Sequence, residues 1–189
     1  MKNKFIFAVM LVMASCSQHE KKQANDTSET MNKIFDDYYE ERLKLFPLEA
    51  TAIADNRYND QLPCDISDSY RRKLQSFYQK YLDEISIIER EELKGEDGLS
   101  FDVFKREMQI QLEGLTFQDN LMPFNQFWGM HLTFAQLGSG GSNQPFKTVK
   151  DYDDFLMRIH GFVIWCDTAV SNMRRGMAQK IVLPKVLAE

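Results

Sequence analysis

The chain has 189 residues, of which 28 are acidic and 23 are basic, giving a formal net charge of −5. This balance excludes the basic stripe that nucleic-acid-binding domains need, and it provides no attraction to anionic lipid. The length is sufficient for one domain with a hydrophobic core.

The first residues resemble the signal of a bacterial lipoprotein. Lys2 and Lys4 give a positive start, and residues 5–14 are apolar but shorter than the roughly 20 residues that span a bilayer. Residues 13–16 read MASC, which is similar to a lipobox whose cysteine receives a diacylglyceryl group. We predict a signal peptide over residues 1–15 and a palmitate-bearing anchor on Cys16. The alternative is an ordinary secretory signal with a chance cysteine.

The lipoprotein prediction implies a location. Ser17 resembles the residue that permits transfer to the outer membrane, so we expect the chain to be lipid-anchored in the cell envelope, facing the periplasm. Residues 16–28 contain Ala24 as their only apolar residue after Cys16 and should form a disordered tether. Residues 29–189 would form the helical domain.

Helical periodicity dominates this domain, because apolar residues recur at i, i+3, i+4 and i+7 in every long pattern. Helices are predicted over about 31–45, 67–93 and 100–117. Thr27 or Ser28 could cap the first helix, and Asp65 or Ser67 the second. Gly95 and Gly98 would end the second helix, and Ser100 would cap the third. We predict an all-α fold, an antiparallel array of about four main helices. The segments near 47–66 and 118–147 should be irregular, apart from a short helix across roughly 125–137.

The longest helix should start at Thr148-x-x-Asp151, which matches a capping box. Its buried stripe is predicted to consist of Tyr152, Phe155, Leu156, Ile159, Val163, Cys166, Val170, Met173 and Met177.

The stretch between residues 46 and 67 follows neither neighbouring helical pattern. Prolines break helix near both of its ends, and its centre is a polar cluster over residues 55–60. A structural interpretation pairs Arg57 with Asp55 or Asp60 and places Tyr58 over a helix end. A functional interpretation makes Arg57 and Tyr58 part of the wall of a ligand cleft.

A second unusual segment is rich in amides and aromatic residues. Asn125, Gln126, Trp128 and His131 could line the rim of a peptide groove. They could equally form a packed aromatic corner whose amides satisfy loop backbone.

Residue patterns for catalysis are lacking. The sequence has no complete HExxH segment, no GxSxG elbow, no Walker A loop and no CxxC pair. Cys64 and Cys166 could form a disulfide or remain as two free thiols. The lone helical histidine, His160, is typical of packing. We therefore predict that this chain contains neither a catalytic residue nor a metal ligand.

Several of these residues carry a resemblance to a known family, which extends over about residues 31–184. The chain resembles the bacterial domain of unknown function family 885, a family similar to helical zinc metallopeptidases. The residues concerned are Pro47, Ala50, Thr51, Asp55, Arg57, Tyr58, Leu62 and Ser67, then Asn125, Gln126 and Gly129, and finally the segment 173–176 leading to Pro184. Ala54 and Lys180 stand where the family pattern would place glycine.

The resemblance implies an HExxH-like segment downstream of residue 189, and zinc in the intact family member. The leading hypothesis is therefore that residues 29–189 are the N-terminal, incomplete part of an exported zinc-metallopeptidase-like domain. In that role they would shape a peptide channel. The alternative hypothesis is a non-catalytic envelope lipoprotein that binds peptide or cell-envelope material.

Overall fold

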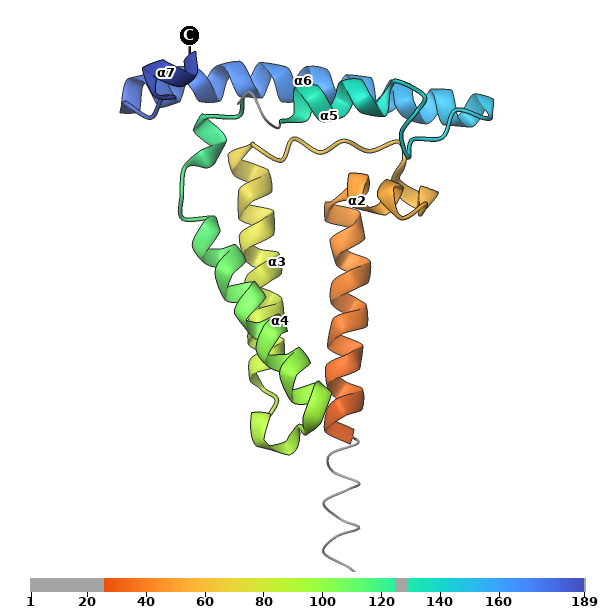
Figure 1. Cartoon of the computed structure of the whole chain (residues 1–189), viewed down its shortest axis with the longest axis vertical. Helices are drawn as coiled ribbons and strands as arrows, with labels where there is room; N and C mark the ends of the chain where they lie inside the picture. The colour runs from red at the N-terminus through yellow and green to blue at the C-terminus, as the bar shows by residue number, and fades with distance from the viewer. Residues whose placement is uncertain (1–25, 125–128, 189) are drawn as a thin grey trace, which may run out of the picture. The chain divides into compact units, whose positions relative to one another are not determined.

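The computed structural model describes residues 26–124 and 129–188. Cys16, Asn125, Gln126 and Trp128, together with the predicted signal peptide and most of the predicted tether, lie outside this range. The described residues form helices and no strand, which confirms the all-α prediction (Figure 1). Within them, no helix combines the length and apolar character needed to cross a membrane.

The elements follow one another in chain order, beginning with a helix over residues 26–45. They continue as α2 (Pro47–Ala52), the 3-10 helix η1 (Asn56–Tyr58), α3 (Asp68–Ser86), η2 (Arg90–Glu92), α4 (Gly95–Gly114), η3 (Asp119–Leu121), α5 (Met130–Leu137), α6 (Val149–Gln179) and α7 (Lys185–Ala188).

The chain divides into two compact units. The first comprises the residues up to Tyr38 together with Tyr78–Gln111, and the second comprises Tyr39–Phe77 together with Leu112–Glu189. The chain changes unit at three places, each inside a helix: the first helix, α3 and α4 therefore each contribute residues to both units.

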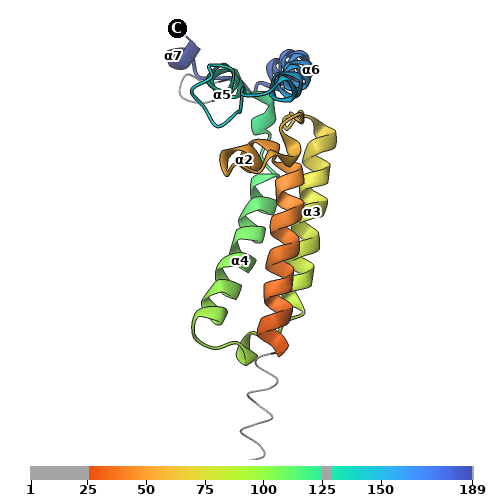
Figure 2. The ribbon, with the colours of Figure 1, turned by 90° about the vertical axis from the view of Figure 1, so that its right-hand side faces the viewer.

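The first unit is a three-helix packing. Its buried core consists of Met31, Ile85, Leu93 and Phe101. The rings of Phe35 and Phe104 pack against this core, with their centroids 4.7 Å apart. Figure 2 shows the three helical segments of this unit side by side, as Figure 1 does from the perpendicular direction. The apolar stripes predicted for these helices therefore face one another.

The start of the first helix differs from the prediction. Residues 26–28, assigned from composition to the tether, are helical. The hydroxyl of Thr27 donates to the carboxylate of Glu92, and that of Ser28 donates to Asp97, each at 2.6 Å. Long-range bonds thus use side chains that the sequence suggested as helix caps.

The predicted second helix is too long. α3 ends at Ser86, where Ile87 points into solvent, and the chain then turns so that Ile88 and Leu93 pack on the core. Its start agrees with prediction, since the hydroxyl of Ser67 accepts the backbone N–H of Tyr70 at 3.2 Å.

The predicted glycine stop is also wrong, because α4 begins at Gly95 and contains Gly98. A Cβ at position 98 would lie 2.5 Å from the Arg90 guanidinium. That guanidinium is in turn held by Asp102, 2.8 Å away. Gly98 therefore leaves room for the Arg90 guanidinium where it lies, a long-range contact that local sequence rules cannot reveal.

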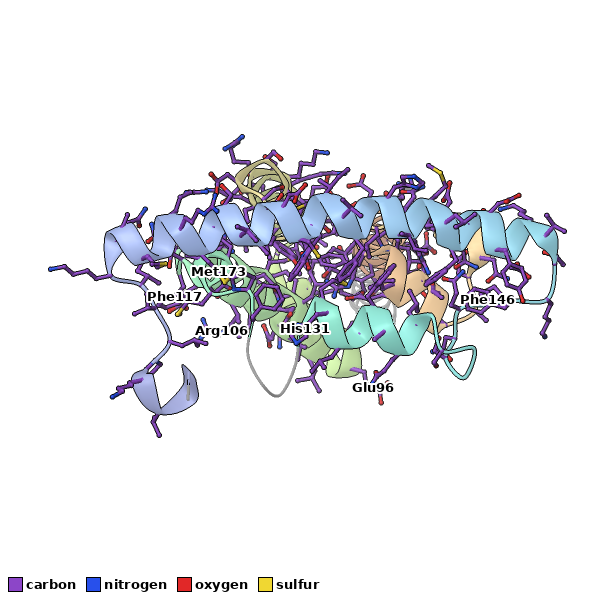
Figure 3. All side chains as sticks on the ribbon, turned by 90° about the horizontal axis from the view of Figure 1, so that it is seen from above. Glu96, Arg106, Phe117, His131, Phe146 and Met173 are labelled. Carbon is purple, nitrogen blue, oxygen red and sulfur yellow. The ribbon has the colours of Figure 1, made fainter. Side chains whose placement is uncertain are left out.

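In the second unit, α5 runs alongside α6 (Figure 3). The buried ring of Phe134 on α5 stacks between Phe155 and Phe162 of α6, with centroid distances of 5.3 and 4.3 Å. Leu62 and Leu137 complete this core. The short helix lies within the predicted 125–137 segment. In contrast, α2 is a helical turn in a region predicted to be irregular.

α6 begins as predicted and buries a different face. The hydroxyl of Thr148 accepts the backbone N–H of Asp151, whose carboxylate accepts the backbone N–H of Thr148 at 2.8 Å. Most of the predicted apolar stripe is exposed, and the remainder is half-buried. The buried residues are instead Asp154, Arg158, Trp165, Ala169, Asn172 and Gly176.

Candidate functional site

Arg158 lies at the centre of the buried face of α6 and is 0% exposed. Its guanidinium donates hydrogen bonds to five oxygen atoms, four of them contributed by residues 47–61. The acceptors are the carbonyl oxygens of Pro47, Tyr58 and Gln61, the hydroxyl of Thr51 and the amide oxygen of Gln144.

All of these acceptors are neutral. Burial therefore lowers the pKa of Arg158 to about 10, although the charges of Asp60 and Asp154 oppose the shift. Burying a cation among neutral oxygens costs free energy of folding. We infer that Arg158 offsets this cost by holding other segments of the chain in position. Here it fixes the path of the chain through α2 and η1.

The same face of α6 holds the extended segment 61–66. Next to Arg158, Gly161 lets this segment approach closely, since a Cβ there would lie 2.6 Å from the carbonyl oxygen of Leu62. The indole N–H of Trp165 donates to Asp65 at 2.7 Å. The amide of Asn172 donates to the carbonyl oxygen of Ile66 at 2.9 Å. One helix face thus binds successive groups of one strand-like segment.

A cavity of about 190 Å³ opens beside this segment. Its walls are mainly apolar, with Asp65 and Glu49 as the carboxylates. The apolar lining consists of Leu45, Phe46, Pro47, Leu48, Leu62, Pro63, Tyr70 and Met130. Glu49 is held by a bidentate contact with Arg42, at 2.7 and 2.8 Å. The Asp65 carboxylate accepts from the Trp165 indole and from the backbone N–H groups of residues 65 and 66.

The carboxylate of Asp65 has an unusual environment. Desolvation by its neighbours raises the pKa of Asp65, and the hydrogen bond from Trp165 opposes that rise. The indole of Trp165 also meets the ring of Phe124 edge-on, with centroids 5.5 Å apart. The carboxylate therefore adjoins both a cavity and an aromatic cluster.

Arg57 and Tyr58 follow the structural interpretation in part. The Arg57 guanidinium pairs with Asp55 at 2.6 Å, as predicted, and with Glu40 at 2.8 Å, which the sequence did not indicate. The pair holds the pKa of the Asp55 carboxyl below its usual range. The Arg57 guanidinium lies over the ring of Tyr58. The backbone carbonyl oxygen of Tyr58 accepts a hydrogen bond from Arg158.

His131 sits in the first turn of α5, at its end nearest the middle of α6 in Figure 3. Its ring packs 5.0 Å from that of Phe124. Its Nδ1 is buried and has no hydrogen-bond partner among the described residues. His131 is thus part of the aromatic cluster, and no described bond joins it to Arg57 or Tyr58. The other three predicted rim residues lie outside the described range.

The cysteines and carboxylates do not assemble a metal site within the described range. Cys64 and Cys166 are free thiols, each half-buried, and burial raises the pKa of Cys64. No group of three or more His, Cys, Asp or Glu side chains in this range could hold a metal ion. His160 is exposed, and its Nδ1 contacts the Leu156 carbonyl oxygen at 2.8 Å.

The family model described as "Bacterial protein of unknown function (DUF885)" matches residues 47–189. The chain belongs to this family. No match was found among curated proteins or among solved structures.

Family membership gives the Arg158 cluster a further meaning. Pro47, Thr51 and Tyr58 carried the resemblance to DUF885, and each supplies an acceptor to Arg158. Thr51 does so through its hydroxyl, and Pro47 and Tyr58 do so through their backbone carbonyl oxygens.

Sequence reasoning missed Arg158, Asp65 and Trp165 as one assembly. A signal for it exists in α6, where the buried positions recur every three to seven residues and include polar and small side chains. The apolar stripe on the neighbouring face is stronger and hides that signal.

Proposed function

We propose that this chain is the N-terminal helical region of an exported, lipid-anchored, zinc-metallopeptidase-like protein of the DUF885 family. In this role it shapes a peptide channel and supplies no catalytic group of its own. The observation that carries the proposal is the cavity beside the segment 61–66. It adjoins the stretch that matches DUF885, and α6 fixes its wall through Arg158, Gly161 and Trp165.

The chemistry of the cavity suits a peptide. A volume of about 190 Å³ is of the order of one large apolar side chain. Asp65 stands at the wall, and a carboxylate has enough lone pairs to accept an N–H from a ligand beside the bonds that it receives from Trp165 and from backbone N–H groups. An extended peptide needs such an alternation of apolar contact and backbone acceptor.

Filling the cavity tests this assignment. Leu48 lines the cavity and is half-buried, so Leu48→Trp should occupy it. The matched control is Ile53→Trp, at an exposed position just after α2. Binding of fluorescent Leu- and Phe-containing peptides to the detergent-solubilised full chain should weaken about tenfold in the first variant only. Equal peptide binding by both variants would remove the cavity from the proposed channel.

The anchor is tested separately. Metabolic labelling with an alkyne palmitate should mark the wild-type chain and leave Cys16→Ala unmarked. Fractionation of the labelled cells should then place the chain in the outer membrane. Equal labelling of the two proteins would contradict the anchor.

Zinc and catalysis belong, in this proposal, to residues outside the described chain. The purified chain should therefore hold no stoichiometric zinc after dialysis and should cleave no member of a peptide library. The DNA that follows codon 189 provides a second test, because an in-frame HExxH-like segment favours the proposal. One tightly held zinc per chain with chelator-sensitive cleavage would overturn it.

A further inference from the structure

α6 presents a second ordered face, formed by the apolar residues that sequence analysis expected to be buried. We call this face the apolar seam. Cys166 and Met173 are half-buried, and the other members are exposed, including Val149 at 78% and Met177 at 69%. Its members are Val149, Tyr152, Leu156, Ile159, Val163, Cys166, Val170, Met173 and Met177.

The members of the seam are spaced alternately three and four residues apart from residue 149 to residue 177. This is the heptad repeat by which two helices pack together as a left-handed coiled coil. At 1.5 Å per residue, the seam is about 42 Å long. Its last two members, Met173 and Met177, also line a cavity with Leu121 and residues 181–183 of the same chain. An exposed apolar face of this length marks an interaction surface, and its spacing suits a helix as the partner.

The two flanks of the seam differ. On one flank Phe155, Phe162 and Ala169 turn toward the core of the second unit and are half-buried or buried. The other flank is exposed and carries all the charge. It consists of the residues that directly follow Tyr152, Ile159, Cys166 and Met173 of the seam. These residues are Asp153, His160, Asp167 and Arg174. No ion pair of Asp153, Asp167 or Arg174 occurs among the described residues.

The charges of this flank match those of a second copy that runs in the opposite direction. Acidic Asp153 lies near the start and basic Arg174 near the end, while His160 and Asp167 lie between them. When two such helices run antiparallel, charged flank meets charged flank. Asp153 of one copy then lies opposite Arg174 of the other, and His160 lies opposite Asp167, with each pair formed twice.

Alternative alignments lose this match. Sliding the antiparallel pair by one heptad in one direction places Asp153 opposite Asp167, and sliding it in the other places Asp167 opposite itself. A parallel pair would set the charged flank of one copy against the aromatic flank of the other. Like charges and unpaired charges disfavour these arrangements.

We propose that α6 pairs with α6 of a second copy of this chain, antiparallel and in the register that joins Asp153 to Arg174. In this register Ile159 of one copy packs against Val170 of the other, and Leu156 packs against Met173. The chain thereby acts as a homodimer, with the apolar seam as its contact.

Disulfide trapping in intact cells tests direction and register together. The full chain carries Cys64→Ser and Cys166→Ser, and the pair Ile159→Cys/Val170→Cys is added to this background. Within one helix these cysteines lie about 16 Å apart and cannot bond to each other. Across the proposed pair they share one layer, so mild oxidation should give a disulfide-linked dimer on non-reducing gels.

The single variants are the matched controls. Ile159→Cys alone and Val170→Cys alone should give no more linked dimer than the background chain. In an antiparallel pair, the introduced cysteine of one chain is far from the same residue of the other chain. In a parallel pair each would bond to its own counterpart. Linked dimer from either single variant would therefore overturn the proposed direction.

A second comparison tests whether the seam itself makes the contact. Added to the double-cysteine chain, Leu156→Glu should lower the linked dimer by about tenfold, since it buries a carboxylate in the seam. Met157 is exposed on the same helix and lies one residue outside the seam. Met157→Glu should therefore leave the amount of linked dimer unchanged. Equal effects of the two, or absence of linked dimer in the double variant, would overturn the proposal. A cysteine at position 159 that resists a water-soluble maleimide without cross-linking would assign the seam to lipid or another protein.

Discussion

The guanidinium of Arg158 donates a 2.7 Å hydrogen bond to the hydroxyl of Thr51, a residue 107 positions earlier in the chain. The same hydroxyl donates to the side-chain oxygen of Asn59, also at 2.7 Å. Asn59 in turn donates to Asn56 within η1. One buried arginine on α6 is therefore connected, through Thr51, to the turn that carries Arg57 and Tyr58.

Removing this arginine should destabilise the protein. Arg158→Met leaves several buried oxygens without donors, which costs about 1–3 kcal/mol for each such group, while removal of the buried charge offsets part of the loss. We expect a net decrease of roughly 2–4 kcal/mol in the free energy of unfolding. Urea unfolding followed by tryptophan emission measures it.

The control for this prediction is Arg174→Met, an exposed arginine on the same helix. Its effect should stay within about 0.5 kcal/mol. If Arg158→Met proved as stable as the wild type, the hydrogen bonds to residues 47–61 would not hold that segment in place.

Gly161 provides a test whose sign is informative. Alanine in place of glycine normally stabilises a helix by up to about 1 kcal/mol. At position 161 the new Cβ would lie 2.6 Å from the carbonyl oxygen of Leu62, so Gly161→Ala should instead destabilise by about 1–3 kcal/mol. Gly114→Ala meets no atom within 4 Å and should be neutral or stabilising. Thermal melting of the two variants distinguishes the cases, and a raised melting temperature in Gly161→Ala would contradict the close approach.

Much of the fold follows from local sequence rules. The apolar stripes of the first three helices, the cap at Ser67 and the capping box at Thr148 are correct because periodicity and caps depend on neighbouring residues. The errors in the predicted helix ends and caps arise where residues distant in sequence determine the local structure. Gly98 lies inside α4 with the Arg90 guanidinium against it, and Thr27 bonds to Glu92 instead of capping its own helix.

The candidate site was harder to predict for the same reason. Arg158 draws its acceptors from α2, η1 and residue 144, and no spacing in the sequence relates these elements. The prediction for the buried face of α6 is also wrong, because the hydrophobic residues of this helix are mostly exposed and its buried residues are mostly polar or small. A helix whose polar side binds backbone and whose apolar side is exposed defeats that rule.

Asp65 predicts a pH dependence. Its pKa is raised in the folded state, so between the unfolded and folded pKa values the native protein holds more protons than the unfolded chain. This group therefore makes the protein more stable as pH falls through that window and less stable as pH rises. Asp65→Asn keeps an acceptor for Trp165 and should remove that contribution, as urea unfolding between about pH 3.5 and 7 would show.

Asp102 gives the opposite sign and serves as the control. Its hydrogen bond with Arg90 lowers the pKa of Asp102, so its contribution is present at neutral pH and is lost as pH falls through the folded pKa. The stability difference between wild type and variant should therefore change in opposite directions for Asp65→Asn and Asp102→Asn. Parallel changes would show that desolvation does not dominate at Asp65.

Lys180 and Ala54 stand where the resemblance to the family predicts glycine, and their backbone conformation shows why glycine would suit both positions. Both residues have left-handed conformations, with φ of 60° and 63° respectively. Glycine adopts this region without penalty, whereas other residues lose roughly 1 kcal/mol there. Both turns thus have a backbone shape that suits glycine, although neither residue is a glycine.

Replacement by glycine should therefore stabilise the protein. Lys180 ends α6, and its N–H bonds to the carbonyl oxygen of Met177 at 3.2 Å, so the turn is already formed around it. We expect Lys180→Gly to raise the free energy of unfolding by about 0.5–1 kcal/mol, the larger flexibility of glycine in the unfolded chain limiting the gain. Gln179→Gly, one residue earlier and inside the helix, should lower it by a similar amount. Urea unfolding of the two variants beside the wild type measures both effects. A loss of stability in Lys180→Gly equal to that in Gln179→Gly would mean that residue 180 does not hold the left-handed conformation in solution.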